Sequence, residues 1–226
     1  PASFKTGYDV DGYSNIQYHT PSGMLPLGLS AKVGYVPNMS ATTALSAKES
    51  DTTIVSEATG RNLTMLQVAA SPVDGLSVKG DVAQTSNETG SSGSGGTEEG
   101  ISANIHAAYT MGPVSVGYVH GGYQPALASG ATVTYENEFM GIQFDVNDAL
   151  SVSYNIDESK KMTRQTIAAG SAGSTTTDVI MEQKSIQLAY TTGGATIGIA
   201  QVEVDNADYT DSKKENQTVF SLGISF

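Results

Sequence analysis

The last ten residues, Gln217–Phe226, alternate apolar and small or polar side chains up to the end of the chain. Four apolar residues share one parity: Phe220, Leu222, Ile224 and Phe226. The other parity carries Val219, Ser221, Gly223 and Ser225. A period of two with one apolar side is typical of a β-strand whose two faces meet different surroundings. The sequence therefore predicts a C-terminal strand with one apolar face and no polar tail beyond it.

The same alternation recurs along the whole chain and predicts about eleven strands, with no helical periodicity. The expected strands are 12–20, 27–36, 62–71, 76–85, 101–111, 114–121, 132–146, 150–157, 185–190, 195–204 and 217–226. Two of them are irregular. In 132–146 the apolar phase slips, which predicts a β-bulge near Asn137–Phe139. In 195–204 the face cannot be assigned, because Ile197 and Ile199 have the opposite parity to Val202 and Val204.

The connections between these strands are sorted by length. Short turns fall at Pro21–Pro26, Pro72–Gly75, Gly112–Pro113, Asn147–Asp148 and Gly193–Gly194. They alternate with long polar segments at 37–61, 86–99, 122–131, 158–178 and 205–216. Transmembrane barrels have this asymmetry, whereas a soluble sandwich has no reason to sort its connections. The predicted fold is an all-β, transmembrane antiparallel β-barrel, with residues 1–226 forming one domain.

Composition is consistent with this prediction and excludes other classes. The sequence contains no run of about 18 apolar residues, so it predicts no membrane-spanning helix. The absence of Cys excludes disulfides and thiolate metal sites. A formal net charge of -12 argues against nucleic acid as a partner. Tyrosines near predicted strand ends, on the expected lipid-facing parity, predict an aromatic girdle: Tyr35, Tyr109, Tyr118, Tyr154 and Tyr190.

Two stretches resemble a known family. The C-terminal strand resembles the closing strand of bacterial outer-membrane barrels, and Asp11–Pro37 is similar to a stretch of proteobacterial general diffusion porins. The similarity rests on Ser14–Pro21 (SNIQYHTP), with Asn and Ser reversed and Thr in place of Ser, and on Gly34-Tyr35. The resemblance implies a sixteen-stranded homotrimer in the Gram-negative outer membrane, in contact with lipid and lipopolysaccharide. The strands counted here would be the sixth to the sixteenth, so further strands are expected before Pro1.

The resemblance also identifies residues 1–11 as the end of the constriction loop, with 12–226 forming strands, turns and loops. Asp9 and Asp11 would then face the narrowest part of the pore, unless they are an ordinary solvated pair. Lys32, Lys79 and Asp81 have lumen parity and would line the pore, although Lys79 and Asp81 could instead pair with each other. Acidic groups in a confined aqueous path favour cations. The expected function is passive diffusion of small hydrophilic solutes and ions, with cation preference.

The sequence predicts no cofactor, although loop-bound Ca²⁺ is a weak candidate. Asp205, Asp208 and Asp211 could hold a divalent cation together with lipopolysaccharide phosphates. Their spacing lacks the central Gly and closing Glu of a calcium loop. The three histidines, His19, His106 and His120, are too far apart in the sequence for a zinc motif.

Two alternatives remain at this stage. One is a soluble or surface β-sandwich of the adhesin type, with a binding or structural role, which would stack two sheets. The other is a smaller, twelve-stranded barrel enzyme, which would place a catalytic Ser–His contact on the outer wall. The porin interpretation predicts that the protein is not an enzyme.

Overall fold

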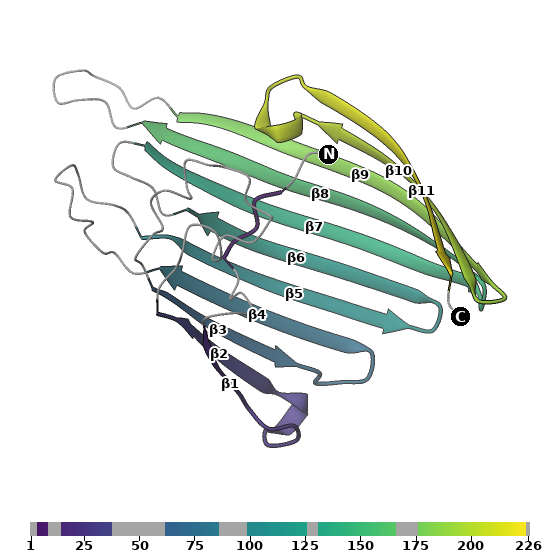
Figure 1. Ribbon diagram of the computed structural model, residues 1–226, viewed down its shortest axis with the longest axis horizontal. Coiled ribbons are helices and arrows are strands. Elements are labelled where there is room, and N and C mark those ends of the chain that lie inside the picture. The colour runs from purple at the N-terminus through teal and green to yellow at the C-terminus, as the bar shows by residue number, and fades with distance from the viewer. Residues whose placement is uncertain are drawn as a thin grey trace.

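A computed structural model describes residues 4–8, 15–37, 62–85, 99–125, 131–165 and 176–224. Strands dominate these residues, and two short 3₁₀ turns, η1 and η2, accompany them (Figure 1). No helix among them is long and apolar enough to cross a membrane. The elements are β1 (Ile16–His19), η1 (Pro26–Gly28), β2 (Ser30–Val36), β3 (Leu63–Ala70), β4 (Leu76–Thr85), β5 (Ile101–Met111), β6 (Val114–Gln124), β7 (Ala131–Asn147), β8 (Leu150–Gln165), β9 (Thr176–Thr192), β10 (Ala195–Asp205), η2 (Ala207–Tyr209) and β11 (Lys214–Ile224).

The strands form one curved sheet in sequence order, from β1 to β11 (Figure 1). Each strand pairs antiparallel with its neighbours in the chain. Consequently the short turns all lie at one end of the sheet and the longer connections at the other, as the sequence predicts. The eleven described strands belong to a single sheet. The sandwich alternative, which requires two stacked sheets, is therefore wrong.

The two faces of the sheet differ in chemistry. We call the face against which Phe4–Tyr8 packs the inner face, and the opposite one the outer face. One register row of the outer face contains Val152, Leu188, Ile199 and Phe220, whereas the adjacent inner row contains Ser153, Gln187, Ala200 and Val219. Phe220, Leu222 and Ile224 are 74%, 65% and 63% exposed. The expected apolar face of the last strand is confirmed, and it is not covered by a second sheet.

The five tyrosines of the expected girdle lie on the outer face, in register with its aliphatic residues. Tyr109 pairs with Leu76 and Val116, and Tyr154 pairs with Ile142 and Ile186. All five tyrosines are about 40% exposed. An aromatic ring at the edge of an apolar wall suits an interface between hydrocarbon and water.

In β7 and β10 the apolar residues change parity along the strand, and no bulge at that point causes the change. The pairing of β7 with β8 is continuous from Ala131 to Asp145, and the register shift lies between Asp145 and Asn147. The bulge expected near Asn137–Phe139 is therefore wrong. Near the end with long connections, Val133 and Tyr135 face inward, whereas Ile142 and Phe144 face outward further along β7. Inward apolar residues are favoured there because packed side chains cover that part of the inner face.

The same inversion explains β10. Ile197 and Ile199 lie on the outer face, whereas Val202 and Val204 point inward, where Val204 packs with Met181 and Ala207. At the corresponding level the outer face becomes charged. A row of directly opposed acids crosses four strands there: Glu138, Glu158, Glu182 and Asp205. The apolar outer band therefore ends at this row on β7–β10.

Several expected strand boundaries are wrong: β6 continues to Gln124 rather than Gly121, β11 begins at Lys214 rather than Gln217, and two larger differences have a local cause. The strand expected over 27–36 begins at Ser30, because Pro26–Gly28 form η1, in which Leu27 has a φ of 57°. The loop expected over 158–178 is much shorter, since β8 continues to Gln165 and β9 begins at Thr176. Charged residues suit a strand here because both faces hold them: Lys160 lies on the charged outer face and pairs with Asp178, and Lys161 Nζ lies over the Tyr209 ring on the inner face.

Candidate functional site

The segment Phe4–Tyr8 lies across the inner face of the sheet (Figure 1). The backbone N–H of Tyr8 donates a hydrogen bond to Ser102 Oγ on β5 at 3.1 Å. At the other end of the segment, Asn137 Nδ2 on β7 donates to the Lys5 carbonyl at 2.9 Å. The Phe4 ring lies 5.1 Å from that of Phe139. Polar and aromatic contacts therefore hold the segment on the inner face.

Gly7 allows this close approach. Its φ of +135° lies in a region that residues with a side chain rarely adopt. A Cβ at this position would lie 2.6 Å from Ser102 Cβ and 2.8 Å from Ser102 Oγ. Glycine is therefore required both by the backbone conformation and by the contact with β5.

Aromatic rings cover the inner face beside this segment. The Tyr8 ring packs edge-on against Tyr123, which stacks on Tyr135, and Tyr135 contacts Tyr209 of η2. Tyr8, Tyr123 and Tyr135 are buried, at 7%, 2% and 5% exposure. They therefore form a packed core that supports the segment, rather than an open aromatic surface for solutes.

Tyr209 links η2 to both the segment and the sheet. Its hydroxyl lies 2.7 Å from Ser159 Oγ and accepts a hydrogen bond from the Lys5 N–H at 3.3 Å. Burial raises the pKa of Tyr209 above its ordinary value, against the lowering effect of these two hydrogen bonds. The neutral phenol is therefore the form that the folded state favours.

This arrangement predicts an alkaline loss of stability. Because the pKa of Tyr209 is raised in the folded state, the stability that its neutral phenol contributes is fully present below the ordinary tyrosine pKa of about 10. This stability is lost as the pH rises through the pKa of Tyr209 in the folded state. Tyr209→Phe is expected to lower the free energy of unfolding by about 1–2 kcal/mol at neutral pH. It is also expected to flatten this decline. Unfolding measured at neutral pH and above pH 10 tests both effects, and an unchanged decline in Tyr209→Phe would contradict the assignment.

Polar side chains form a second group on the inner face, next to the segment. Lys32, Gln67, Asp81 and Asn104 lie opposite one another on β2–β5. Asn104 Nδ2 donates to Asp81 Oδ2 at 2.9 Å, and His106 Nε2 lies 3.4 Å from Asp81 Oδ1. The Asp81 side chain is 10% exposed and that of His106 is 38% exposed. Asp81 is therefore held in place by its neighbours on β5.

A cavity of about 280 Å³ opens between this polar group and the segment. Its lining includes Tyr8, Lys79, Asp81, Asn104, His106 and Phe139. Both signs of charge and several hydrogen-bonding groups therefore line one aqueous space, where they can orient a polar solute or attract an ion.

The expected pore-lining residues lie on this inner face. Lys32 lies on β2 and both Lys79 and Asp81 lie on β4, and all three have inner-face parity, as the sequence predicts. Among the described residues, Asp81 pairs with His106 and not with Lys79, so the expected alternative of a Lys79–Asp81 pair is not formed. Asp9 and Asp11 lie outside the described residues. Sequence reasoning missed Asn104, the partner of Asp81, and Ser102, the partner of Tyr8. These contacts depend on the register between strands, which the alternation of side chains does not fix.

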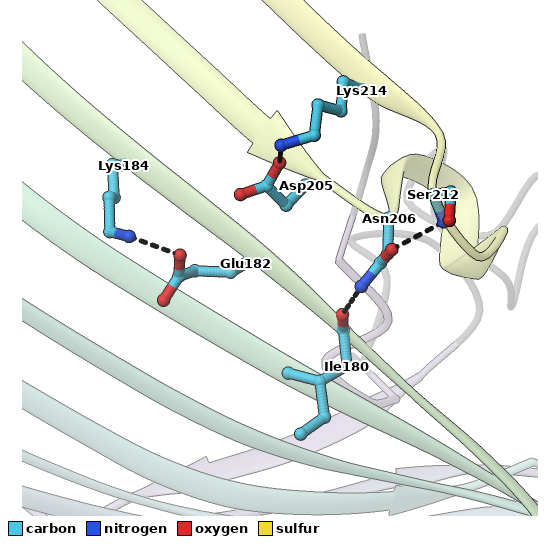
Figure 2. Close-up of polar contacts among 7 residues, drawn as sticks. All are labelled: Ile180, Glu182, Lys184, Asp205, Asn206, Ser212 and Lys214. Atoms are coloured by element: carbon cyan, nitrogen blue, oxygen red, sulfur yellow. Dashed lines mark hydrogen bonds and ion pairs between the residues drawn. The ribbon is translucent and has the colours of Figure 1, made fainter.

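Two of the three aspartates considered for Ca²⁺, Asp205 and Asp208, pair with lysines. Lys214 Nζ lies 2.8 Å from Asp205 Oδ1, beside a second pair between Lys184 and Glu182 (Figure 2). Lys213 Nζ lies 2.6 Å from Asp208 Oδ2. The pKa of Lys213 is raised chiefly by its hydrogen bond to Asp208 and next by its hydrogen bond to Glu215, so the ammonium stays charged. The described part of the chain contains no group of three acids or histidines placed to hold a metal. Whether the three aspartates hold a divalent cation together with lipopolysaccharide phosphates stays a prediction.

Asn206 fixes the connection that carries these aspartates. Its Nδ2 donates to the Ile180 carbonyl of β9 at 2.7 Å, and its Oδ1 accepts from the Ser212 N–H at 2.8 Å (Figure 2). The connection between β10 and β11 is thereby tied to the neighbouring strand, which positions Tyr209 over the inner face.

Comparison with known proteins gives the fold. No protein-family model matches the chain, and no curated protein matches its sequence. Two solved structures of OmpT, an outer membrane protein of Vibrio cholerae, are similar at TM-scores of 0.57 (in-vitro folded) and 0.55 (outer-membrane expressed). Identity is 11% in both, over 92% of this chain. The chain spans 60% and 61% of the lengths of those proteins. The fold is that of an outer-membrane β-barrel, which agrees with the bacterial outer membrane as the expected location.

Proposed function

We propose that this chain forms part of a water-filled porin channel for passive diffusion of small hydrophilic solutes and ions. The supporting observation is the contrast between its two faces. The inner face carries Lys32, Gln67, Asp81 and Asn104 in register beside a cavity, whereas the outer face carries an apolar band. In a closed barrel, this arrangement gives an aqueous path surrounded by a lipid-compatible wall. The resemblance of Asp11–Pro37 to general diffusion porins points in the same direction.

We propose that the channel prefers cations. The formal net charge is -12, and Asp9 and Asp11 precede the strand that leads into the barrel. Asp81 adds a carboxylate to the inner face, which also carries the positive charges of Lys32 and Lys79. The test is the reversal potential of the full-length protein in a planar lipid bilayer across a KCl gradient. A cation-selective potential is expected, and an anion-selective one would refute the preference.

Asp81 offers a test of the inner face itself. Asp81→Asn is nearly isosteric and removes one negative charge beside the cavity. A unit charge about 4 Å from an ion is worth about 1 kcal/mol in water, so the cation-to-anion permeability ratio is expected to fall by up to about fivefold. Asp178→Asn is the matched control, because Asp178 lies on the outer face and pairs with Lys160. Equal reversal potentials for the wild type and Asp81→Asn would contradict a pore-lining role.

We also propose that the protein assembles as a homotrimer in contact with outer-membrane lipid and lipopolysaccharide. This proposal rests on the family resemblance. The test is the migration of full-length protein on detergent gels before and after heating. A heat-sensitive trimer band is expected, and migration as a monomer before heating would contradict the trimer.

We propose that the protein is not an enzyme. In the described residues, His19 contacts Gln17 and His106 contacts Asp81, and neither partner is the serine that a Ser–His hydrolase would need. His120 lies on the outer face opposite Ile105 and Glu138. Phospholipid hydrolysis by the purified protein, abolished in His120→Ala, would contradict this proposal.

A further inference from the structure

The outer face contains a groove of about 670 Å³ across β3–β8. Its floor is made of residues with small side chains on three adjacent strands: Gly80, Ala103 and Gly122. Leu66, Val82 and Ile105 form its sides at β3–β5. These residues have the parity of the lipid-facing wall, so the groove opens away from the channel.

The chemistry of the groove changes along its length. At β3–β5 the outward-facing residues that line it are aliphatic or glycine, and the polar residues there, Asp81 and Asn104, have inner-face parity. At β6 and β7, His120 and Glu136 line it from the outer face. In the next outer-face row, Glu138 on β7 lies opposite His120, and Glu158 on β8 lies opposite Glu138. The groove therefore runs from the apolar band into the charged band of the outer face. A pocket of this size with an apolar body and a few polar groups at one end suits an amphiphile.

We propose that the groove binds one phospholipid molecule with an ethanolamine headgroup. An acyl chain lies over Gly80 and Ala103 between Leu66, Val82 and Ile105, and the ammonium of the headgroup meets Glu136. This occupant follows from continuity with the lipid-facing wall and from charge. Glu136, Glu138 and Glu158 complement an ammonium and disfavour an anionic headgroup. Lys160, which lies opposite Glu136, is paired with Asp178.

Two floor residues can be enlarged without disturbing the sheet. Ala103 is exposed on the outer face, so a leucine there would extend into the groove. A Cβ on Gly80 would meet the Asn104 carbonyl oxygen at 3.7 Å, an ordinary contact. Ala195→Leu is the matched control, because Ala195 lies on the same face, opposite Thr192 and Ile224 and outside the groove.

The experiment uses full-length protein, delipidated in mild detergent and titrated with phosphatidylethanolamine or phosphatidylglycerol of the same acyl composition. Native mass spectrometry measures occupancy by the first lipid. Ala103→Leu and Gly80→Leu are each expected to weaken phosphatidylethanolamine binding by about tenfold. This is the loss expected when roughly two methylene groups of the acyl chain are no longer buried in the groove. Ala195→Leu is expected to bind as the wild type does. Glu136→Gln is expected to remove the preference for phosphatidylethanolamine.

Other outcomes would overturn the proposal. Equal first-lipid occupancy in the wild type and both groove variants would show that the groove holds no lipid. Equal affinity of the wild type for the two lipids would overturn the headgroup assignment. A shift to smaller oligomers in Ala103→Leu, but not in Ala195→Leu, would show that a second copy of the chain occupies the groove. Heat-modifiable migration distinguishes these outcomes from a failure to fold, and none of them depends on channel conductance.

Discussion

Replacing Leu188 by arginine is expected to destabilise the folded protein in lipid by about 2–4 kcal/mol, the cost of a charged side chain on the lipid face near mid-depth. Leu188 lies in an outer-face row of apolar residues, with Val152, Ile199 and Phe220. Strand alternation points the next residue, Gln187, to the inner face, where water can solvate a charge. Gln187→Arg is therefore expected to cost less than about 1 kcal/mol.

The pair of variants separates the two environments with the same introduced side chain on adjacent residues of one strand. Denaturant unfolding of protein folded into lipid vesicles gives both free energies. If the two substitutions destabilise the protein equally, the outer face does not contact hydrocarbon. If Gln187→Arg is the more damaging, the two faces are reversed and the channel proposal fails with the fold assignment.

Most of the fold follows from local alternation, and β11 shows why. From Phe220 to Ile224 its apolar parity is strict, and the structure places that parity on the outer face. In β7 and β10 the parity of the apolar residues changes along the strand, which the sequence alone presents as a slip in the alternation. Val133 and Val204 face a packed interior near the end with long connections, while Ile142 and Ile197 face outward further along their strands. Alternation reports the polarity of each face, and that polarity inverts along these strands.

The site is less accessible to sequence reasoning than the fold. Parity places Lys79 and Asp81 on one face, but it does not reveal that Asp81 bonds Asn104 on the next strand. That contact depends on register, which tertiary pairing sets. Likewise, Gly7 carries no local signal, because its requirement comes from Ser102, far away in the sequence. The ends of β8 and β9 near the long connections have the composition of a loop for a related reason, since their outer face carries charged side chains such as Glu158 and Glu182.

Replacing Gly7 by alanine is expected to displace Phe4–Tyr8 from the inner face and to raise single-channel conductance. The backbone conformation at φ +135° and the 2.6 Å approach to Ser102 Cβ both oppose a side chain. Strain of this kind costs about 1–3 kcal/mol, which is about a 5–150-fold change in the ratio of seated to displaced segment. Displacement removes the hydrogen bond of Tyr8 to Ser102 and widens the cavity beside Asp81.

Gly23→Ala is the matched control for this prediction. Gly23 also has a positive φ, of +75°, but a Cβ there would meet nothing within 4 Å, and the residue lies in the turn between β1 and β2. Planar-bilayer recordings of both full-length variants should show larger conductance for Gly7→Ala alone. An unchanged conductance, with heat-modifiable migration intact, would mean that the segment does not limit the aqueous path. The constriction would then lie elsewhere, because a segment that narrows a channel cannot leave its wall without changing the current that the channel carries.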